Sequence, residues 1–163
     1  MKEQAIIYKV GIEGRKDVIK IKPLMDLHKG ARTCDLKAFK EYLKDRDENT
    51  HFLTNGDLWD MIMFSDKRFR PSGHDKTDID DPIDEEVDEM ADLLSPVAGH
   101  MIGIGHGNHE DTVVQRCGTN PSKRLAEKLN VPYMGYSWWF RLSMRADGGM
   151  GKSVDFLDRK SVV

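Results

Sequence analysis

The sequence has few cysteines, no long apolar run and almost no excess charge. The two cysteines in 163 residues, Cys34 and Cys117, match neither the spacing of a zinc site nor that of a redox pair. Free thiols in a reducing compartment explain them better than a disulfide framework does. No apolar run approaches the roughly 20 residues that a membrane-spanning helix needs, and the first residues lack the apolar core of a signal peptide. We therefore expect a cytoplasmic protein without a membrane partner.

The balance of charge also excludes broad classes of partner. A net charge of −3, from 25 basic and 28 acidic residues, provides no general attraction to nucleic acid or to an anionic membrane, although it leaves room for a local basic patch. With 39% hydrophobic and 33% charged residues, the composition is that of a globular protein. A chain of this length is long enough for one domain with its own core, so we treat residues 1–163 as a single domain.

Strand patterns and helix patterns alternate along most of the chain. Apolar or alternating runs predict strands over residues 5–10, 18–25, 51–54, 100–104, 134–144 and 153–156. Helical spacing predicts helices over residues 35–46, after residue 61, from residue 82 to Pro96 and from residue 121, with Thr33 or Asp35, Asp81 and Asn120 as caps. The elements between residues 18 and 54 form a βαβ unit, whose strands are parallel with a right-handed crossover. The chain is therefore predicted to be an α/β protein with a mostly parallel first sheet.

Polar side chains follow three of the predicted strands where each strand ends. They form three short segments, Asp26 and His28, Asp57 and Asp60, and Asn108 and His109. In open α/β sheets, ligands collect outside the carboxyl ends of the strands, so we expect these segments to meet at one edge. Their donors are oxygen and nitrogen atoms without a thiolate, which suits Mn²⁺, Fe or Zn²⁺ better than a structural cysteine-type zinc site. The segments therefore predict a metal centre for hydrolysis.

The chemistry of these residues suggests a role for each of them. Two metal ions about 3.5–4 Å apart need a bridging carboxylate, and Asp57 follows the central one of the three strands. His109, next to Asn108, can protonate a leaving oxygen as a general acid. Asp60 can accept the other ring proton of His109 and so fix the tautomer of the imidazole.

Three motifs in this order resemble those of the calcineurin-like metallophosphoesterase superfamily, in particular its phage and bacterial members. They are Asp26-x-His28, Gly56-Asp57-x-x-Asp60 and Gly107-Asn108-His109-Glu110, and together they span residues 26–110. The resemblance implies that Asp26 and His28 bind a first metal ion and that Asp57 bridges two ions, with Mn²⁺ as the expected metal. It implies that Asn108 binds the second ion and the substrate phosphate, and that His109 is the acid. It also implies a sandwich of two β-sheets flanked by helices.

The chain departs from this family after the third motif. Members of the family carry further metal ligands downstream, a histidine after the next strand and then a Gly-His-x-His motif, but no histidine follows His109 here. The predicted strand over residues 134–144 has one strongly apolar face, and in the family the sheet that covers it comes largely from the C-terminal half. We therefore expect the N-terminal half of a metallophosphoesterase, a C-terminally truncated domain. Its open apolar strand predicts self-association or pairing with a complementary C-terminal half.

The predicted activity is metal-dependent hydrolysis of phosphate monoesters or diesters. Nucleic acid, nucleotides, phosphoproteins and small phosphate esters all fit that chemistry, and the loop residue Arg32 can reach a substrate phosphate. The alternative is a non-catalytic fragment or interaction module, which the missing histidines favour. A third interpretation, a nucleotide-binding loop at Gly151-Lys152-Ser153, lacks the glycine that the motif requires at the position of Ala146. A glycine-rich hairpin at residues 147–149 is therefore preferred.

Overall fold

Four parallel strands form the centre of the fold, in the order β2-β3-β4-β5. They are β2 (Lys20–Met25), β3 (Thr50–Gly56), β4 (Met101–Gly105) and β5 (Tyr133–Gly135). The computed structural model describes residues 4–14, 16–61, 82–146 and 151–158, and within them the chain is an α/β protein with four α-helices and two sheets. The strand pairs of the central sheet are all parallel, so the predicted βαβ unit is confirmed.

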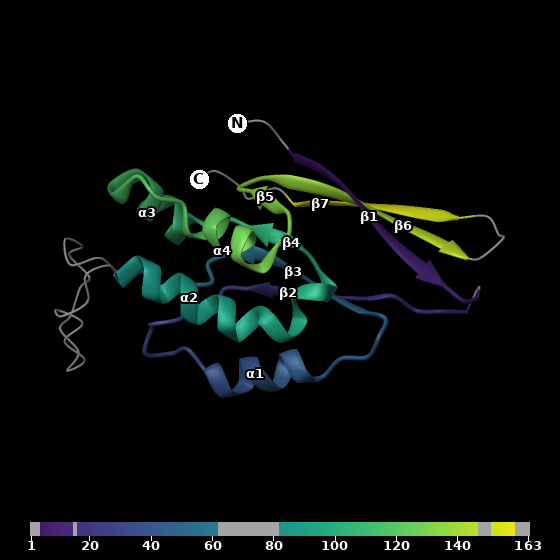
Figure 1. Ribbon diagram of the computed structural model, residues 1–163, viewed down its shortest axis with the longest axis horizontal. Helices are drawn as coiled ribbons and strands as arrows, with labels where there is room; N and C mark the ends of the chain where they lie inside the picture. Colours follow the sequence, from purple (N-terminus) through teal and green to yellow (C-terminus); the bar gives the residue numbers. More distant parts are fainter. Residues whose placement is uncertain (1–3, 15, 62–81, 147–150, 159–163) are drawn as a thin grey trace.

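Helices cover one face of this sheet (Figure 1). The helical segments are α1 (Leu36–Lys44), α2 (Pro82–Leu94), the 3₁₀ helix η2 (Ser95–His100), α3 (Asn108–Cys117) and α4 (Pro121–Leu129). An apolar cluster joins Leu43 of α1, Met90 of α2 and Leu125 of α4 to Phe52 and Ile104 of the sheet. Burial of large side chains of this kind, each contributing about 1.5–3 kcal/mol, holds the helical layer on the sheet.

Local sequence signals account for where these helices begin. The Asp35 carboxylate accepts a hydrogen bond from the Ala38 N–H at 2.9 Å, and the Asn120 side chain accepts one from the Lys123 N–H at 2.9 Å. Asn120 was the predicted cap of α4, and Asp35 was one of the two caps predicted for α1, beside Thr33. The start of α2 at Pro82 was predicted as well. Apolar residues at helical spacing face the core, because Val87, Met90 and Leu94 of α2 are fully buried, while Ile83 packs against the same core with part of its surface exposed. The predicted cap Asp81 and the helix predicted after residue 61 lie outside the described residues.

A second sheet of three strands, β1 (Gln4–Ile12), β6 (Trp138–Ala146) and β7 (Lys152–Asp158), packs on the other face of the parallel sheet (Figure 1). Its order is β1-β6-β7, with β1 parallel and β7 antiparallel to β6. Trp138, Phe140 and Leu142 of β6 are at most 5% exposed and form a cluster with Leu53 and Ile102 of the central sheet. The two sheets therefore enclose a second apolar core.

The prediction of one long strand over residues 134–144 is wrong. The chain leaves the parallel sheet at Gly135, which has a left-handed backbone with φ of 80°, and enters the other sheet at Trp138. Met134 still shares the apolar cluster of β6, because the chain crosses from one side of that cluster to the other. The alternation of apolar residues therefore continues across a break that separates two strands.

The prediction that this apolar face is open is also wrong, because the central sheet of the same chain covers it. Self-association through residues 134–144 remains a prediction, but an open apolar face no longer supports it. The return strand predicted at residues 153–156 is confirmed as part of β7. The hairpin turn predicted at residues 147–149 lies outside the described residues.

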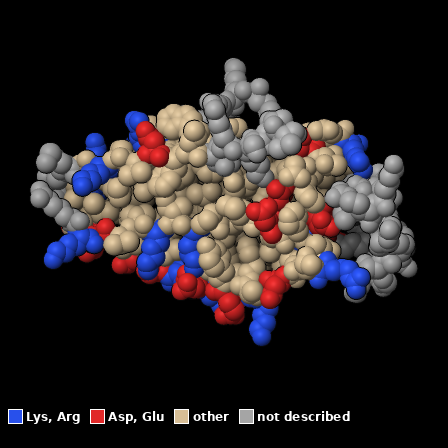
Figure 2. All heavy atoms as spheres, turned by 180° about the vertical axis from the view of Figure 1, so that it is seen from behind, with Lys and Arg blue, Asp and Glu red and all other residues tan. Residues whose placement is uncertain are grey.

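The surface agrees with the small net charge. Seen from behind, the molecule carries uncharged residues across its middle, with acidic and basic side chains of both signs along its lower edge (Figure 2). Within the described residues, no helix has both the length and the apolar character to cross a membrane.

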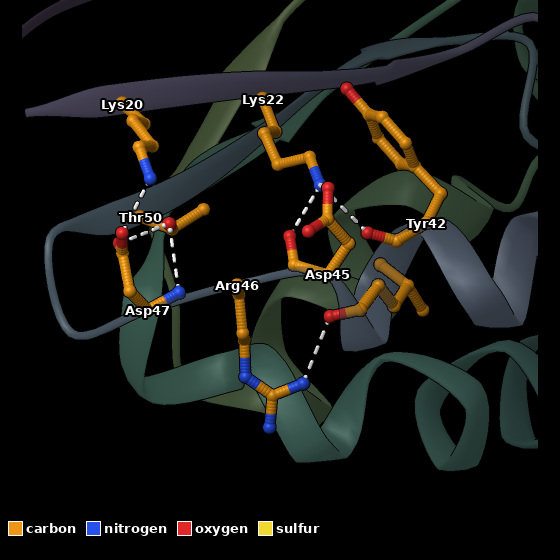
Figure 3. Close-up of polar contacts among 8 residues, drawn as sticks. Lys20, Lys22, Tyr42, Asp45, Arg46, Asp47 and Thr50 are labelled. Atoms are coloured by element: carbon orange, nitrogen blue, oxygen red, sulfur yellow. Dashed lines mark hydrogen bonds and ion pairs between the residues drawn. The ribbon is translucent and has the colours of Figure 1, made fainter.

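A polar network ties the end of α1 to the first residues of β2 and β3 (Figure 3). The Lys22 ammonium donates to the Tyr42 carbonyl and to the Asp45 carboxylate, both at 3.0 Å. The Lys20 ammonium donates to the Asp47 carboxylate, which also accepts from the Thr50 hydroxyl at 2.6 Å. These two hydrogen bonds lower the pKa of the Asp47 carboxyl from 3.8 to about 2, and the Lys20 bond has the larger effect.

We expect Asp47→Asn to destabilise the fold at neutral pH and to have little effect near pH 2. In the folded protein Asp47 keeps its charge down to about pH 2, whereas in the unfolded chain it takes up a proton near pH 3.8. Its contribution is therefore full above about pH 4 and is lost as the pH falls toward 2. Urea unfolding of both proteins across this range measures the effect, with Glu48→Gln as an exposed control. A stability difference that stays constant from neutral pH to about pH 3 would contradict the prediction.

Candidate metal centre

The segments that follow β2 and β3 run side by side beyond the ends of the strands. The Asp26 N–H donates to the Gly56 carbonyl at 3.3 Å, and the His28 N–H donates to the Asp57 carbonyl at 3.1 Å. The Lys29 N–H continues the pattern by donating to the Leu58 carbonyl at 2.9 Å. This continued pairing brings the first predicted segment beside the second, as expected for the carboxyl ends of neighbouring parallel strands.

The backbone takes an unusual conformation at three of the predicted metal ligands. Asp26, His28 and Asp57 have φ angles of 52°, 48° and 54°, in the left-handed region. Few residues other than glycine adopt this region, and residues that do often mark functional sites. The strained positions in the first two motifs therefore coincide with the residues that those motifs assign to metal binding.

The loops after β3 and β4 touch so closely that two glycines are required. A Cβ atom on Gly56, whose φ is 92°, would lie 2.1 Å from the Gly107 nitrogen. A Cβ atom on Gly107 would lie 2.2 Å from Asp57 Oδ1. The absence of a side chain at both positions lets the third motif approach the second.

Helix α3 begins in this contact, and its first turn carries His109 and Glu110. The Asp57 Oδ1 atom accepts a hydrogen bond from the His109 N–H at 3.1 Å. The helical spacing in the sequence did not predict this helix. Two signals for it were present, because Gly107 precedes an acidic residue at the third helical position and Gly118, with φ of 70°, ends the helix.

Glu110 is the last residue of the third motif, and it lies inside the protein. Its side chain is fully buried. The carboxylate accepts hydrogen bonds from three backbone N–H groups, those of Asp57 at 3.0 Å, Leu58 at 2.8 Å and Gly107 at 2.8 Å. It therefore links the loop after β3 to the beginning of α3.

His28, Asp60 and His109 come together at the edge of the sheet. Each offers one ligand atom, and these atoms all lie within 4.8 Å of one another. The rings of His28 and His109 meet edge to face, with centroids 4.6 Å apart. The closest partner of His109 Nδ1 is the Asp60 backbone carbonyl at 2.8 Å, while the Asp60 carboxylate lies at 3.6 Å. The hydrogen bond predicted for the Asp60 side chain is thus made by its main chain.

The other predicted site residues lie around this cluster. Asp26 Oδ1 is 3.9 Å from His28 Nε2, and the Asp26 side chain is 66% exposed. Asp57 is buried, whereas Asn108, the first residue of α3, is exposed. Arg32 is exposed in the loop before α1, and no hydrogen bond or ion pair among the described residues joins it to the cluster. The structure therefore brings together the three motifs, and the proposed role of Arg32 stays a prediction.

The described histidines that the motifs leave unused lie outside this cluster. His106 is buried, with Nε2 3.6 Å from Asp111 Oδ1 and its ring against Tyr133 and Tyr136. His51 Nδ1 lies 2.9 Å from the Tyr8 hydroxyl. Burial, and to a smaller extent nearby His100, lowers the pKa of His51, which favours the neutral ring. Neither His51 nor His106 belongs to the group of His28, Asp60 and His109.

Helix α2 holds the same segments from another side. The Lys29 ammonium, 11% exposed, donates to the carboxylates of Glu86 and Glu89. Burial alone would lower the pKa of Lys29, but its hydrogen bonds to Glu86 and Glu89 and their negative charges raise it overall. The Trp59 indole N–H donates to the Glu86 carbonyl at 3.1 Å. The segments after β2 and β3 are therefore both attached to α2.

The donor set fits a divalent metal ion. Two imidazoles and one carboxylate within 4.8 Å of one another need only a small closure to ligate one ion, because ligand atoms lie about 2.0–2.2 Å from a metal such as Zn²⁺. Asp26 and Asp57 add nearby carboxylates. For a second ion, the third motif adds the exposed Asn108, whose neighbour His109 is hydrogen-bonded through its N–H to Asp57. The described residues thus supply more donors for a first ion than for a second.

Comparisons of the chain with protein-family models, with curated proteins and with solved structures find no match. The interpretation of the site therefore depends on its residues and their geometry.

We expect Gly107→Ala to destabilise the protein by about 1–3 kcal/mol, because its Cβ would overlap the Asp57 carboxylate and force the loops apart. Gly99→Ala is the matched control, since a Cβ on Gly99 meets no atom within 4 Å. Urea unfolding measures the free energy of unfolding of each variant. Equal stability of the two variants would mean that the close contact between Gly107 and Asp57 is absent in solution.

Proposed function

We propose that this chain is a metal-dependent phosphoesterase of the calcineurin-like metallophosphoesterase type. The observation that carries the proposal is the meeting of three motifs from distant parts of the sequence. His28, Asp60 and His109 form one group of donor atoms, and Asp57 is hydrogen-bonded to the backbone of His109. The arrangement of a parallel sheet against a second, three-stranded sheet supports the proposed sandwich.

In this proposal Asp26, His28, Asp57 and Asn108 hold two divalent ions, with Mn²⁺ preferred over Fe or Zn²⁺. Such ions supply positive charge that attracts a phosphate ester, and they make water acidic enough to react at neutral pH. Asp57 would have the bridging role, because the residue lies between the other two motifs: its backbone carbonyl accepts a hydrogen bond from the His28 N–H and its carboxylate accepts one from the His109 N–H. Asn108 is exposed at the start of α3 and is available to a substrate phosphate.

His109 is the proposed general acid. The Asp60 carbonyl can only accept a hydrogen bond, so the 2.8 Å contact assigns a proton to His109 Nδ1. A protonated ring then has Nε2–H as the group that gives its proton to the leaving oxygen, while Nδ1–H stays bound to Asp60. Asp60 acts as a positioning residue that selects which nitrogen faces the substrate.

The geometry also favours a second assignment, with one ion ligated by His28, Asp60 and His109. This simpler site needs only the three donors that lie together. In that case His109 is a metal ligand and not an acid. The described residues supply fewer donors for a second ion, which supports the alternative function of a non-catalytic interaction module.

The substrate class proposed is a phosphate monoester or diester, including nucleotides and nucleic acid. Both exposed donors of the site, Asp26 and Asn108, lie at the carboxyl edge of the sheet, which leaves that edge open to a phosphate. Arg32 remains a proposed phosphate contact from the neighbouring loop.

We expect Asp57→Asn to weaken Mn²⁺ binding by at least about 10-fold, because removing a direct ligand should cost no less than removing an outer partner does. Calorimetric titration of wild type and variant measures this, with the exposed Asp92→Asn as control. If the wild-type protein itself binds no Mn²⁺, the enzyme proposal fails and the interaction module takes its place.

We expect His109→Ala to lower hydrolysis of bis(p-nitrophenyl) phosphate by about 10²–10⁴-fold, the usual contribution of a general acid, while Mn²⁺ binding persists. Rates at saturating Mn²⁺ and a calorimetric titration are compared for wild type, His109→Ala and the control His100→Gln. Loss of Mn²⁺ binding together with activity would instead identify His109 as a ligand.

A further inference from the structure

We propose that Glu110 is a positioning residue, whose buried carboxylate sets the place of Asp57 and thereby the affinity of the site for metal. The inference rests on the proposed function, because it concerns the same site. It assigns a role to a residue that neither binds the metal nor touches the substrate.

Glu110 lies inside the protein, where backbone groups surround its carboxylate. Its side chain is fully buried, and within the described part of the chain its hydrogen bonds come only from backbone N–H groups. No Lys, Arg or His side chain there forms an ion pair with it. A buried carboxylate is costly without compensation, and three N–H donors together with the N-terminal end of α3 provide it. Such an arrangement has a role that an apolar side chain could not fill.

The N–H groups that bind Glu110 belong to two different loops. Two of the N–H groups belong to Asp57 and Leu58, directly after β3, and the third belongs to Gly107, directly before α3. Oε2 accepts from both Asp57 and Gly107, so a single oxygen joins the two loops. Glu110 therefore sets the distance between the second motif and the third.

Asp57 is bound to α3 through both its backbone N–H and its side chain. Its N–H donates to Glu110, and its Oδ1 accepts from the N–H of His109, the neighbour of Glu110 in the first turn. These two hydrogen bonds hold the left-handed backbone of Asp57 and the direction of its carboxylate. A metal ion then meets a ligand that is already in place, which lowers the cost of binding.

Only glutamate has the length and the two acceptor oxygens that these three N–H groups need. A glutamine has one carbonyl oxygen and one NH₂ group, so at least one of the three N–H groups would face another donor. An aspartate is shorter by one methylene and would bring its oxygens less close to donors on two loops. Glu110→Gln therefore preserves size but removes part of the connection.

The test compares Glu110→Gln with Val113→Ala, which removes buried apolar volume from the same helix and leaves the carboxylate intact. We expect Glu110→Gln to stay folded by circular dichroism and to bind Mn²⁺ about 10- to 100-fold more weakly. The rate of bis(p-nitrophenyl) phosphate hydrolysis should recover at saturating Mn²⁺. Val113→Ala should lose stability but keep its Mn²⁺ affinity. The exposed control Glu127→Gln should also keep its Mn²⁺ affinity.

Unchanged Mn²⁺ affinity in Glu110→Gln, or an equal loss in Val113→Ala, would overturn the inference while leaving the proposed function standing. A wild-type protein that binds no Mn²⁺ overturns both. If Glu110→Gln does not fold, amide hydrogen exchange of the wild-type protein decides. The Asp57, Leu58 and Gly107 amides should exchange as slowly as those of β3, and exchange at the rate of an exposed loop would refute the role of Glu110.

Discussion

Three hydrogen bonds from backbone N–H groups to the Glu110 carboxylate are the constraint on which the candidate site depends. They join the loop after β3 to the start of α3 out of contact with solvent, where each unpaired group would cost about 1–3 kcal/mol. Because these loops touch, Gly56 and Gly107 cannot carry side chains. Because Asp57 presents both its N–H and its carboxylate to α3, it adopts a left-handed backbone. The two glycines, the strained aspartate and the buried glutamate are therefore parts of one arrangement.

The rest of the fold provides a rigid edge for this arrangement. The central sheet is buried on both faces, by helices on one side and by β1, β6 and β7 on the other. Alternate residues of β3 serve the two cores, since Phe52 packs toward the helices and Leu53 toward the second sheet. A strand enclosed in this way cannot shift its register without exposing apolar side chains. The positions of Asp57 and Asp60 after β3 are thus determined by packing that begins several residues earlier.

Much of the fold could be predicted from the sequence because its signals are local. Caps such as Asp35 and Asn120, the start of α2 and the βαβ unit required only spacing and residue type. Helix α3 was missed because its short, polar sequence buries only Glu110 and Val113, so it has little apolar periodicity. The break at Gly135 was missed because alternation continues across it. In the site, motif order identified the residues that meet. It could not reveal that the Asp60 carbonyl contacts His109, since this contact depends on the path of the backbone.

Some residues of the candidate site are fixed by hydrogen bonds to the helices, and others are exposed to solvent. Asp57 and His109 are fixed through α3, while Lys29 and Trp59 attach the adjoining segments to α2. Asp26 and Asn108 are exposed at the same edge. Under the proposed function, the residues that must hold a defined geometry are those with the most hydrogen bonds to the scaffold, and those left to solvent are the ones that an incoming phosphate would meet first. Because the carboxylates of Asp57 and Asp26 differ so much in exposure, under this proposal Asp57 would be the pre-positioned ligand and Asp26 the one free to adjust to an ion.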